Sequence, residues 1–391
     1  MKTLKLSFFL IISFLSFESN AQQAKEILGI ANEQKELQYY QNQSELWKEK
    51  LSINSKDRKA WVNYYKAKRA IYQKKDYKFW VENRAEIFKK LEPILDDLYK
   101  ELPDSFEYYW LKSGNTVNKE EAFKLASKAY NISPERKETY EELFIYYMTR
   151  WQTENAATIA QKILKSNFYA NALYQWNLNS LNVANPQSIL ITHGDLDTLP
   201  RWVLQTGKSI RNDVLIINPW LMVYSKEYLK GVFLKLNIPS FYKSVLDFKN
   251  KEIYKNKLLK YIIDQVGKTR TIHFDCGTDV KLFETLNIKE KMYLTGVSFT
   301  YSNEVIDNLK ITKHNFEEVL YLDYLFSDFQ MHPQSDIVKK TLNISYIPGL
   351  MKMKSYYTTA SNQKMIQKYD SLINKILEDS GRKEEILSWY E

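Results

Sequence analysis

The fold is decided by the stretch Ile189-Leu190-Ile191-Thr192-His193-Gly194-Asp195-Leu196-Asp197-Thr198-Leu199-Pro200-Arg201-Trp202. Its first residues are apolar and rich in β-branched side chains, which predicts a short strand covered on both faces. Gly194 allows a tight turn that a side chain would hinder. Pro200 fits the first turn of a helix, where its missing N–H costs nothing. A strand, a polar turn and a helix are therefore expected in succession.

The polar turn of this stretch is the first candidate site. Ligands of open α/β sheets bind beyond the carboxyl ends of the strands, which is where His193, Asp195 and Asp197 would lie. Two carboxylates could bind a cation or sugar hydroxyls, and Arg201 could counter a phosphate. Asp197 or Thr198 would serve equally as the cap of the helix. A ligand site and a capped turn, the more common of the two, both remain open.

A second polar group ends the strand expected at Thr271–Asp275. In a parallel sheet Asp275 would share an edge with Asp195, and a pair of carboxylates across a cleft is the usual equipment of glycoside chemistry. His273, in the same strand, is more often a satisfied core residue. The histidine spacing predicts no metal site. The chain shows no phosphate loop, dinucleotide fingerprint or nucleophile elbow, so the cofactor stays unknown.

Composition and charge predict the compartment and argue against one class of partner. Met1–Ala21 has the charged start, apolar core and small-residue end of a cleaved signal peptide, which predicts a periplasmic or, alternatively, a secreted protein. No later stretch is long and apolar enough to cross a bilayer. Cys276, the only cysteine, is expected to be a buried thiol. The net charge is +9, but basic and acidic residues are interspersed, so nucleic acid is not an expected partner.

A helical repeat is visible between about Ser44 and Val183. Gly and Pro are sparse there, and the small residues Ala126 and Ala160 occupy equivalent positions 34 residues apart. Ser133-Pro134 breaks the helix where the next unit begins. A helix-turn-helix period of 34 resembles the tetratricopeptide repeat family. Such repeats present a concave face to a peptide or protein, which here implies an envelope partner; packing against the following domain is an equal alternative.

Strands and helices alternate after a polar linker at 184–187. The expected strands are Ser188–Ile191, Asp213–Asn218, Thr271–Asp275 and Met292–Ser298. The expected helices are Leu199–Ser209, Ser225–Leu236, Asn250–Val266 and Asp279–Leu286. This alternation is typical of a mainly parallel sheet with helices on both faces. The predicted class is α plus α/β, with a signal peptide at 1–21, tetratricopeptide-like helices at 22–183, and an α/β domain with C-terminal helices at 184–391.

A second resemblance rests on the motif Gly194-Asp195-x-Asp197-Thr198-x-Pro200-x-Trp202-x-x-Gln205, followed by Arg211-x-Asp213-Val214 and Ile217-Asn218. Residues 188–305 are thereby similar to the soluble C-terminal portion of a family of bacterial polytopic membrane proteins. Those proteins have no assigned function and are predicted to be protein O-mannosyltransferase-like. The segment Tyr293-Leu294-Thr295-Gly296-Val297 resembles a second part of that portion. The resemblance does not extend to the membrane-embedded transferase part, so it implies no catalytic residues.

Two functions follow from these patterns. The first is an exported binding or accessory protein whose helical repeats hold an envelope protein, with a link to glycan or glycoprotein assembly. The alternative is a hydrolase or transferase that acts on a carbohydrate or phosphate ester through Asp195 and Asp197. Both readings place the decisive residues in the turn after the first expected strand.

Overall fold

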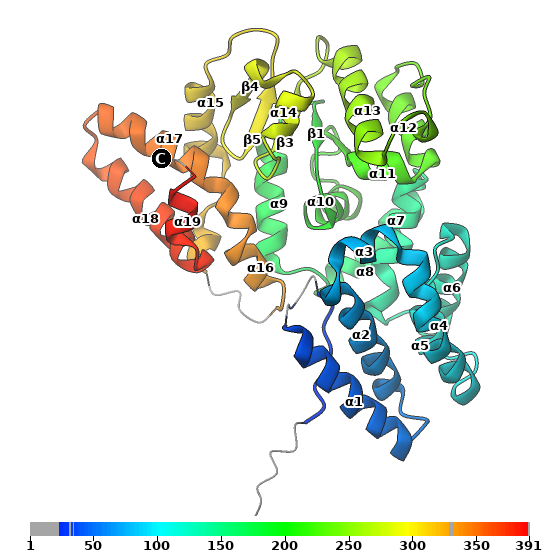
Figure 1. Ribbon diagram of the computed structural model, residues 1–391. Helices are drawn as coiled ribbons and strands as arrows, with labels where there is room; N and C mark the ends of the chain where they lie inside the picture. The colour runs from blue at the N-terminus through cyan, green and yellow to red at the C-terminus, as the bar shows by residue number, and fades with distance from the viewer. Residues whose placement is uncertain (1–22, 31–32, 34, 328–331, 390–391) are drawn as a thin grey trace, which may run out of the picture.

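The computed structural model describes residues 23–30, 33, 35–327 and 332–389 (Figure 1). The predicted signal peptide at 1–21 lies outside these residues. The described chain is mostly helical and contains a five-stranded sheet, with helices before and after it in the sequence. None of the helices in the described ranges is both long enough and apolar enough to cross a bilayer.

The helices that precede the sheet form an N-terminal array. Their bounds are α1 Leu37–Ile53, α2 Arg58–Lys75, α3 Tyr77–Glu82, α4 Arg84–Glu101, α5 Phe106–Gly114, α6 Lys119–Ile132, α7 Tyr140–Thr149, α8 Thr153–Lys165 and α9 Asn171–Val183. Several begin at a side chain that accepts a free backbone N–H, namely Asp57, Asp76, Ser105 and Asn118. These caps fix where each helix starts, because they satisfy donors that the helix itself leaves unpaired.

The 34-residue period appears directly in the helix positions. Helices α5 and α7 begin at Phe106 and Tyr140, and helices α6 and α8 begin at Lys119 and Thr153, so both pairs are offset by 34 residues. Helix α5 packs against α6, and α7 packs against α8. Ala160 is fully buried, as expected of a small residue where two helices approach closely. The predicted helical repeat is therefore confirmed for two helix-turn-helix units.

The sheet is mixed, with the strand order β2-β1-β3-β5-β4. Its strands are β1 Ile189–Ile191, β2 Leu215–Ile217, β3 Ile272–Asp275, β4 Met292–Leu294 and β5 Ser298–Tyr301. Strands β1, β2 and β3 are parallel as predicted, whereas β4 and β5 form an antiparallel hairpin. The prediction of a single strand over Met292–Ser298 was wrong, because Gly296 (φ +109°) reverses the chain within that run. A mixed sheet thus replaces the mainly parallel one.

Helices cover both faces of the sheet. Every residue of β1 and β3 is buried. Successive side chains of a strand point to opposite faces. Phe274 packs against Phe283 on one face, while Asp275 meets Ser180 of α9 on the other. The covering and connecting helices that follow β1 are α10 Asp195–Lys208, α11 Pro219–Tyr224, α12 Lys226–Leu236, α13 Lys251–Val266 and α14 Lys281–Thr285.

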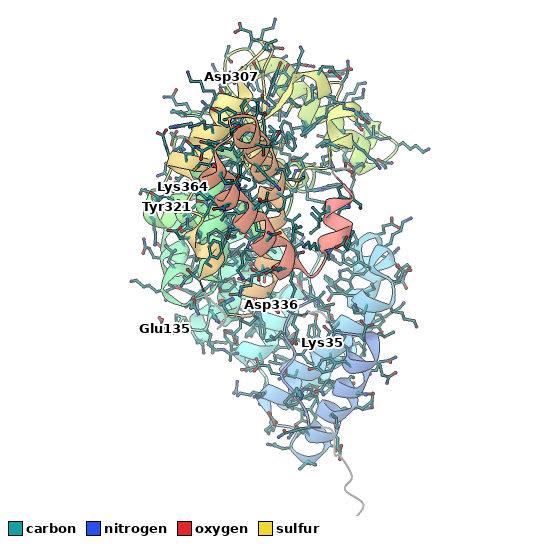
Figure 2. All side chains as sticks on the ribbon, turned by 90° about the vertical axis from the view of Figure 1, so that its left-hand side faces the viewer. Lys35, Glu135, Asp307, Tyr321, Asp336 and Lys364 are labelled. Carbon is teal, nitrogen blue, oxygen red and sulfur yellow. The ribbon has the colours of Figure 1, made fainter. Side chains whose placement is uncertain are left out.

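The C-terminal region is a helical cap on the same core. Its helices are α15 Asn308–His314, α16 Ser335–Lys340, α17 Ile347–Thr359, α18 Gln363–Ser380 and α19 Lys383–Leu387. Helices α17 and α18 lie side by side (Figure 2). Residues 360–362 separate the two helices, and α18 ends at Gly381, whose φ of +64° is in the left-handed region. Helix α16 contacts α9, so this cap also touches the last helix of the N-terminal array.

The predicted division at residues 183 and 184 is not confirmed. One buried apolar cluster runs from Ala126 in α6, through α9 and the sheet, to Ile386 in α19. Helices α1, α2, α4 and α5 contribute to a separate cluster. Arg211 also closes the linker, since its guanidinium donates to the carbonyls of Leu181 (2.7 Å) and Ala184 (2.8 Å) at the end of α9. The second helical unit and the sheet therefore share one core.

Candidate functional site

The turn after β1 is held by a carboxylate of its own. Asp197, in the first turn of α10, accepts hydrogen bonds from the backbone N–H groups of His193 and Gly194, both at 2.7 Å. Its side chain is buried, and burial raises the pKa of Asp197 to about 6. Both carboxylate oxygens are thus engaged with the backbone. Helix α10 begins at Asp195 with Gly194 as its N-cap, four residues before the predicted start at Leu199, so neither Asp197 nor Thr198 is the cap residue. Asp197, at the third helical position, instead reaches back to the N–H of the cap residue.

Thr198 joins the ends of β1 and β2. Its hydroxyl donates to the Gly194 carbonyl at 2.6 Å and lies 2.7 Å from Thr192 Oγ1, directly after β1. Asn218, directly after β2, donates its side-chain amide to the same hydroxyl at 3.0 Å. The buried hydroxyl therefore has three close polar neighbours, and its contacts position the turn.

Arg201 and Asp275 form a buried ion pair between α10 and β3. The guanidinium donates to both carboxylate oxygens, with the longer bond at 3.0 Å. Ser180 of α9 donates to the same carboxylate at 2.7 Å. The guanidinium carbon lies 5.1 Å from the centroid of the Trp176 ring. The fold thus brings together two predicted site residues that are 74 positions apart, but each neutralises the other rather than a ligand.

His193 has one ring nitrogen without a partner among the described residues. Its Nε2 lies 2.6 Å from Thr278 Oγ1. That hydroxyl donates to the Asp275 carbonyl at 2.6 Å, so Nε2 is the donor of the pair and Nδ1 carries the lone pair. Burial lowers the pKa of His193, which keeps the ring neutral at pH 7. The ring is only partly buried, so Nδ1 is available as an acceptor.

Asp195 begins α10 and is exposed, with no hydrogen-bond partner in the described part of the chain. Partial desolvation raises the pKa of Asp195, and the Arg84 guanidinium at the start of α4 opposes that rise. Asp195 in turn helps to raise the pKa of Glu141 on α7, which burial brings to about 7. The turn after β1 therefore lies where α4 and α7 of the N-terminal array approach the sheet.

Two glutamates of α7 extend this junction, and sequence reasoning missed both. Glu141 accepts a hydrogen bond from the Tyr169 hydroxyl at 2.9 Å, and Glu142 accepts one from Ser113 at 2.7 Å. Burial raises the pKa of Glu142 as well. Their sequence gives no signal, because glutamates in the first turn of a helix are ordinarily solvated. The burial that raises the pKa values of Glu141 and Glu142 arises only because neighbouring helices pack against α7.

The other candidate groups have contacts typical of a core. His273 Nε2 accepts the Asn185 N–H at 3.1 Å, and Nδ1 contacts Thr300 at 3.0 Å. Burial lowers the pKa of His273 to about 4, so the ring is neutral. Burial also raises the pKa of Cys276 well above its usual value, which keeps it a thiol. Within the described ranges no three His, Cys, Asp or Glu side chains converge as a metal site.

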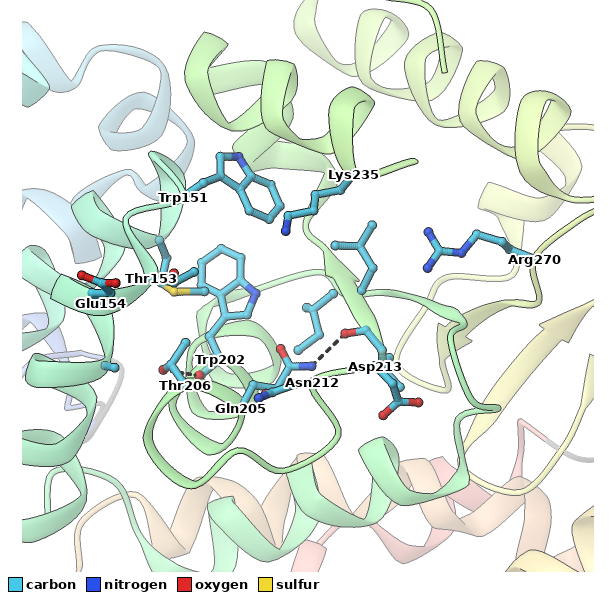
Figure 3. A pocket seen from close by; sticks show the side chains of 15 residues that line it. Trp151, Thr153, Glu154, Trp202, Gln205, Thr206, Asn212, Asp213, Lys235 and Arg270 are labelled. Carbon is cyan, nitrogen blue, oxygen red and sulfur yellow. Dashed lines mark hydrogen bonds between the residues drawn. The ribbon is translucent and has the colours of Figure 1, made fainter. Parts of the chain in front are cut away.

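A cavity of about 520 Å³ lies between α7, α8, α10 and the edge strand β2 (Figure 3). Trp151 and Trp202 are among the residues that line it, and Lys235 Nζ lies 6.0 Å from the centroid of the Trp151 ring. Trp151 fits beside α12 because residue 231 is glycine. A Cβ at Gly231 would come within 1.7 Å of the indole. None of the six predicted site residues lines this cavity.

The edge of β2 that faces this cavity is closed to strand addition. Gln205 Nε2 donates to the Val214 carbonyl at 2.8 Å, and the Tyr228 hydroxyl donates to the Ile216 carbonyl at 3.2 Å. An added strand would need these acceptors, so side chains protect the edge. The cavity is therefore a seam between the second helical unit and the sheet rather than a groove for an extended peptide.

Comparisons with known proteins add little to this geometry. No family model matches the chain, and no curated protein matches it. Among solved structures, the crystal structure of yeast Tom70 aligns with a TM-score of 0.27 and 12% identity, covering 90% of this chain and 58% of Tom70. A likeness this low carries no argument about fold or function. The resemblance of residues 188–305 to the mannosyltransferase-like membrane family therefore has no support from these comparisons.

Proposed function

We propose that the protein binds a polypeptide partner where its N-terminal helices meet the turn after β1. The main support is that some predicted site residues are bonded within the fold, whereas others keep free hydrogen-bond acceptors. Asp197, Arg201 and Asp275 are engaged within the fold. The exposed Asp195 carboxylate and the Nδ1 atom of His193 have no partner among the described residues. These two acceptors favour contact with hydrogen-bond donors of another chain.

The apolar part of the proposed surface is helix α3. Tyr77 is 70% exposed, and Phe79 and Val81 on the same short helix are also exposed. Trp80 between them is buried and anchors the helix. Helix α3 leads directly into α4, whose first residue, Arg84, acts electrostatically on Asp195. An exposed apolar helix beside unpaired acceptors is typical of a protein interaction surface. A partner segment with an apolar side chain and nearby donors fits this chemistry.

The partner is proposed to be an envelope protein, because the sequence at 1–21 has the pattern of a signal peptide. A role in glycan or glycoprotein assembly is a finer proposal, and it rests on the sequence resemblance of residues 188–305 alone. The alternative of a hydrolase or transferase has weaker support. It needs a free carboxylate beside Asp195, whereas both oxygens of Asp197 accept backbone hydrogen bonds.

Site-specific photo-crosslinking in the native host tests the proposed surface. A photoreactive side chain at Tyr77 and, separately, at Asp195 should yield an adduct with the same partner. The matched control is Ile53, an exposed apolar residue at the end of α1. Asp195→Asn should reduce capture from position 77 by about tenfold or more, because a charge-assisted hydrogen bond contributes roughly 1.5–3 kcal/mol. Equal capture from Ile53, or no capture from either test position, would contradict the proposal.

A further inference from the structure

Helices α12 and α13 with their connection hold most of the excess positive charge of the chain. Residues 226–260 contain nine lysines, no arginine and three acidic residues, which is a net charge of +6 in a chain of +9. Two of these lysines form ion pairs, Lys255 with Glu252 and Lys260 with Asp264. The lysines without a carboxylate partner in the described structure are Lys226, Lys230, Lys235, Lys243, Lys249, Lys251 and Lys257.

Two large apolar side chains protrude from the connection between these helices. Tyr242 is 81% exposed and Leu246 is 90% exposed. Lys243 lies beside them, with its Nζ 5.4 Å from the centroid of the Tyr242 ring. Leu234, near the end of α12, is exposed as well. Removing apolar surface from water is favourable by about 25 cal/mol per Å². Large apolar side chains that protrude among lysines therefore favour contact with an apolar phase.

The connection holds these side chains outward because its other rings pack inward. Phe241 and Phe248 stack with their centroids 6.5 Å apart. Phe248 also contacts Tyr254 of α13, with centroids 5.4 Å apart. This aromatic packing anchors the connection on the core side. The exposure of Tyr242 and Leu246 is therefore a built feature of the fold rather than the result of a loose loop.

We propose that residues 226–260 attach the protein to an anionic lipid surface. The lysines other than Lys235, which lines the cavity beside Trp151, would lie among the headgroups, attracted by the negative surface potential, while Tyr242 and Leu246 reach the acyl boundary. Nucleic acid supplies phosphates but no apolar phase for Leu246, and this surface lacks the arginines that bind phosphate in a bidentate manner. Figure 1 places α12 and α13 at the end of the molecule away from α1, so α1 would face away from the lipid.

Co-sedimentation of the protein with vesicles tests the charge requirement. The protein should bind phosphatidylcholine vesicles that contain phosphatidylglycerol and should not bind phosphatidylcholine alone. Binding should weaken as salt is added, since salt shortens the Debye length. Lys243→Glu/Lys249→Glu should lower the apparent affinity more than tenfold, because each lysine at the surface contributes about fivefold. The matched control, Lys48→Glu/Lys50→Glu on α1, should bind like the wild type.

A second pair of variants tests the apolar requirement. Tyr242→Ser/Leu246→Ser should lower vesicle binding severalfold and abolish the binding that remains at high salt, whereas Ile53→Ser on α1 should change neither. Binding to neither vesicle type, or equal binding to both, would overturn the proposal. So would a Tyr242→Ser/Leu246→Ser variant that binds as the wild type does. Tighter binding to oligodeoxythymidylate than to anionic vesicles, with the same lysine dependence, would reassign the surface to nucleic acid.

Discussion

At the scale of single residues, Arg201 connects α10 to the sheet through its buried pair with Asp275. Arg201→Met would leave the Asp275 carboxylate unpaired in the interior. We expect the free energy of unfolding in denaturant to fall by about 3–5 kcal/mol. Arg201→Met/Asp275→Leu should lose much less, because no charge is then stranded. The exposed pair Lys289–Glu284 is the control, and Lys289→Met should change stability by no more than about 1 kcal/mol. Equal losses in the two single variants would refute this account.

Glu141 makes stability depend on pH. Burial raises its pKa to about 7, against about 4.3 in an unfolded chain. Between these values the folded state binds the proton more tightly, so stability falls as the pH rises from about 4.3 to about 7. The groups that face Glu141 are Tyr169, Asp195 and Glu142.

Glu141→Gln should remove this dependence, because glutamine resembles the protonated acid and cannot ionise. The variant should melt at a higher temperature than the wild type at pH 8 and at nearly the same temperature at pH 5. Glu227→Gln, on the exposed face of α12, should show the same difference from wild type at both pH values. A Glu141→Gln variant that is destabilised equally at pH 5 and pH 8 would show that the buried charge is not costly.

Contacts between residues close in the sequence were predictable in the turn after β1, whereas contacts between distant residues were not. The part that Asp197 plays at the start of α10 is local, so the sequence indicated it, although the helix starts four residues earlier than predicted. The pairing of Arg201 with Asp275 depends on how α10 lies over β3, and no local pattern predicts a contact across 74 residues. One signal was present: Arg201 lies between Pro200 and Trp202, within a run that is otherwise apolar. A charge in such a position needs a buried partner.

At the scale of elements, Gly231 allows α12 to approach Trp151. Alanine is the better helix former and would stabilise an isolated helix by up to about 1 kcal/mol. In this structure the added Cβ would come within 1.7 Å of the indole. Gly231→Ala should therefore destabilise the protein by about 1–3 kcal/mol in denaturant unfolding and alter the tryptophan fluorescence. Gly277→Ala, where a Cβ meets no atom within 4 Å, should do neither. Equal effects at both glycines would contradict this close packing.

The elements themselves were largely predictable where a local pattern decides them. Strands β1, β2 and β3 fall inside their predicted ranges, since short apolar runs bounded by polar turns favour buried strands. The hairpin of β4 and β5 was missed because Gly296 lies between Thr295 and Val297, without the Asn-Gly or Asp-Gly pair that usually marks a tight reversal. Tertiary contacts decide which strands pair, so the spacing of the strands in the sequence does not predict the antiparallel edge of the sheet.

At the scale of the whole molecule, the shared core predicts shared stability. Helices α8 and α9 belong to the same buried cluster as β1 and β3. Hydrogen exchange should therefore show amides of α8, α9 and β1 opening with similar free energies, as one cooperative unit. Mass spectrometry of peptides from each element measures this directly. Early exchange of α8 and α9, while β1 stays protected, would restore the two-domain division that the sequence suggested.

The hydrogen bonds that Arg211 makes to the linker determine where a reporter can be attached to this protein. On paper, the polar linker at 184–187 is an attractive point for inserting a fluorescent tag. Its carbonyls, however, accept hydrogen bonds from Arg211, and the Gln187 N–H donates to Asp213 at 3.0 Å. A tag there would pull apart the end of α9. The turn at Val305, between β5 and α15, is exposed and is the better place for such a label.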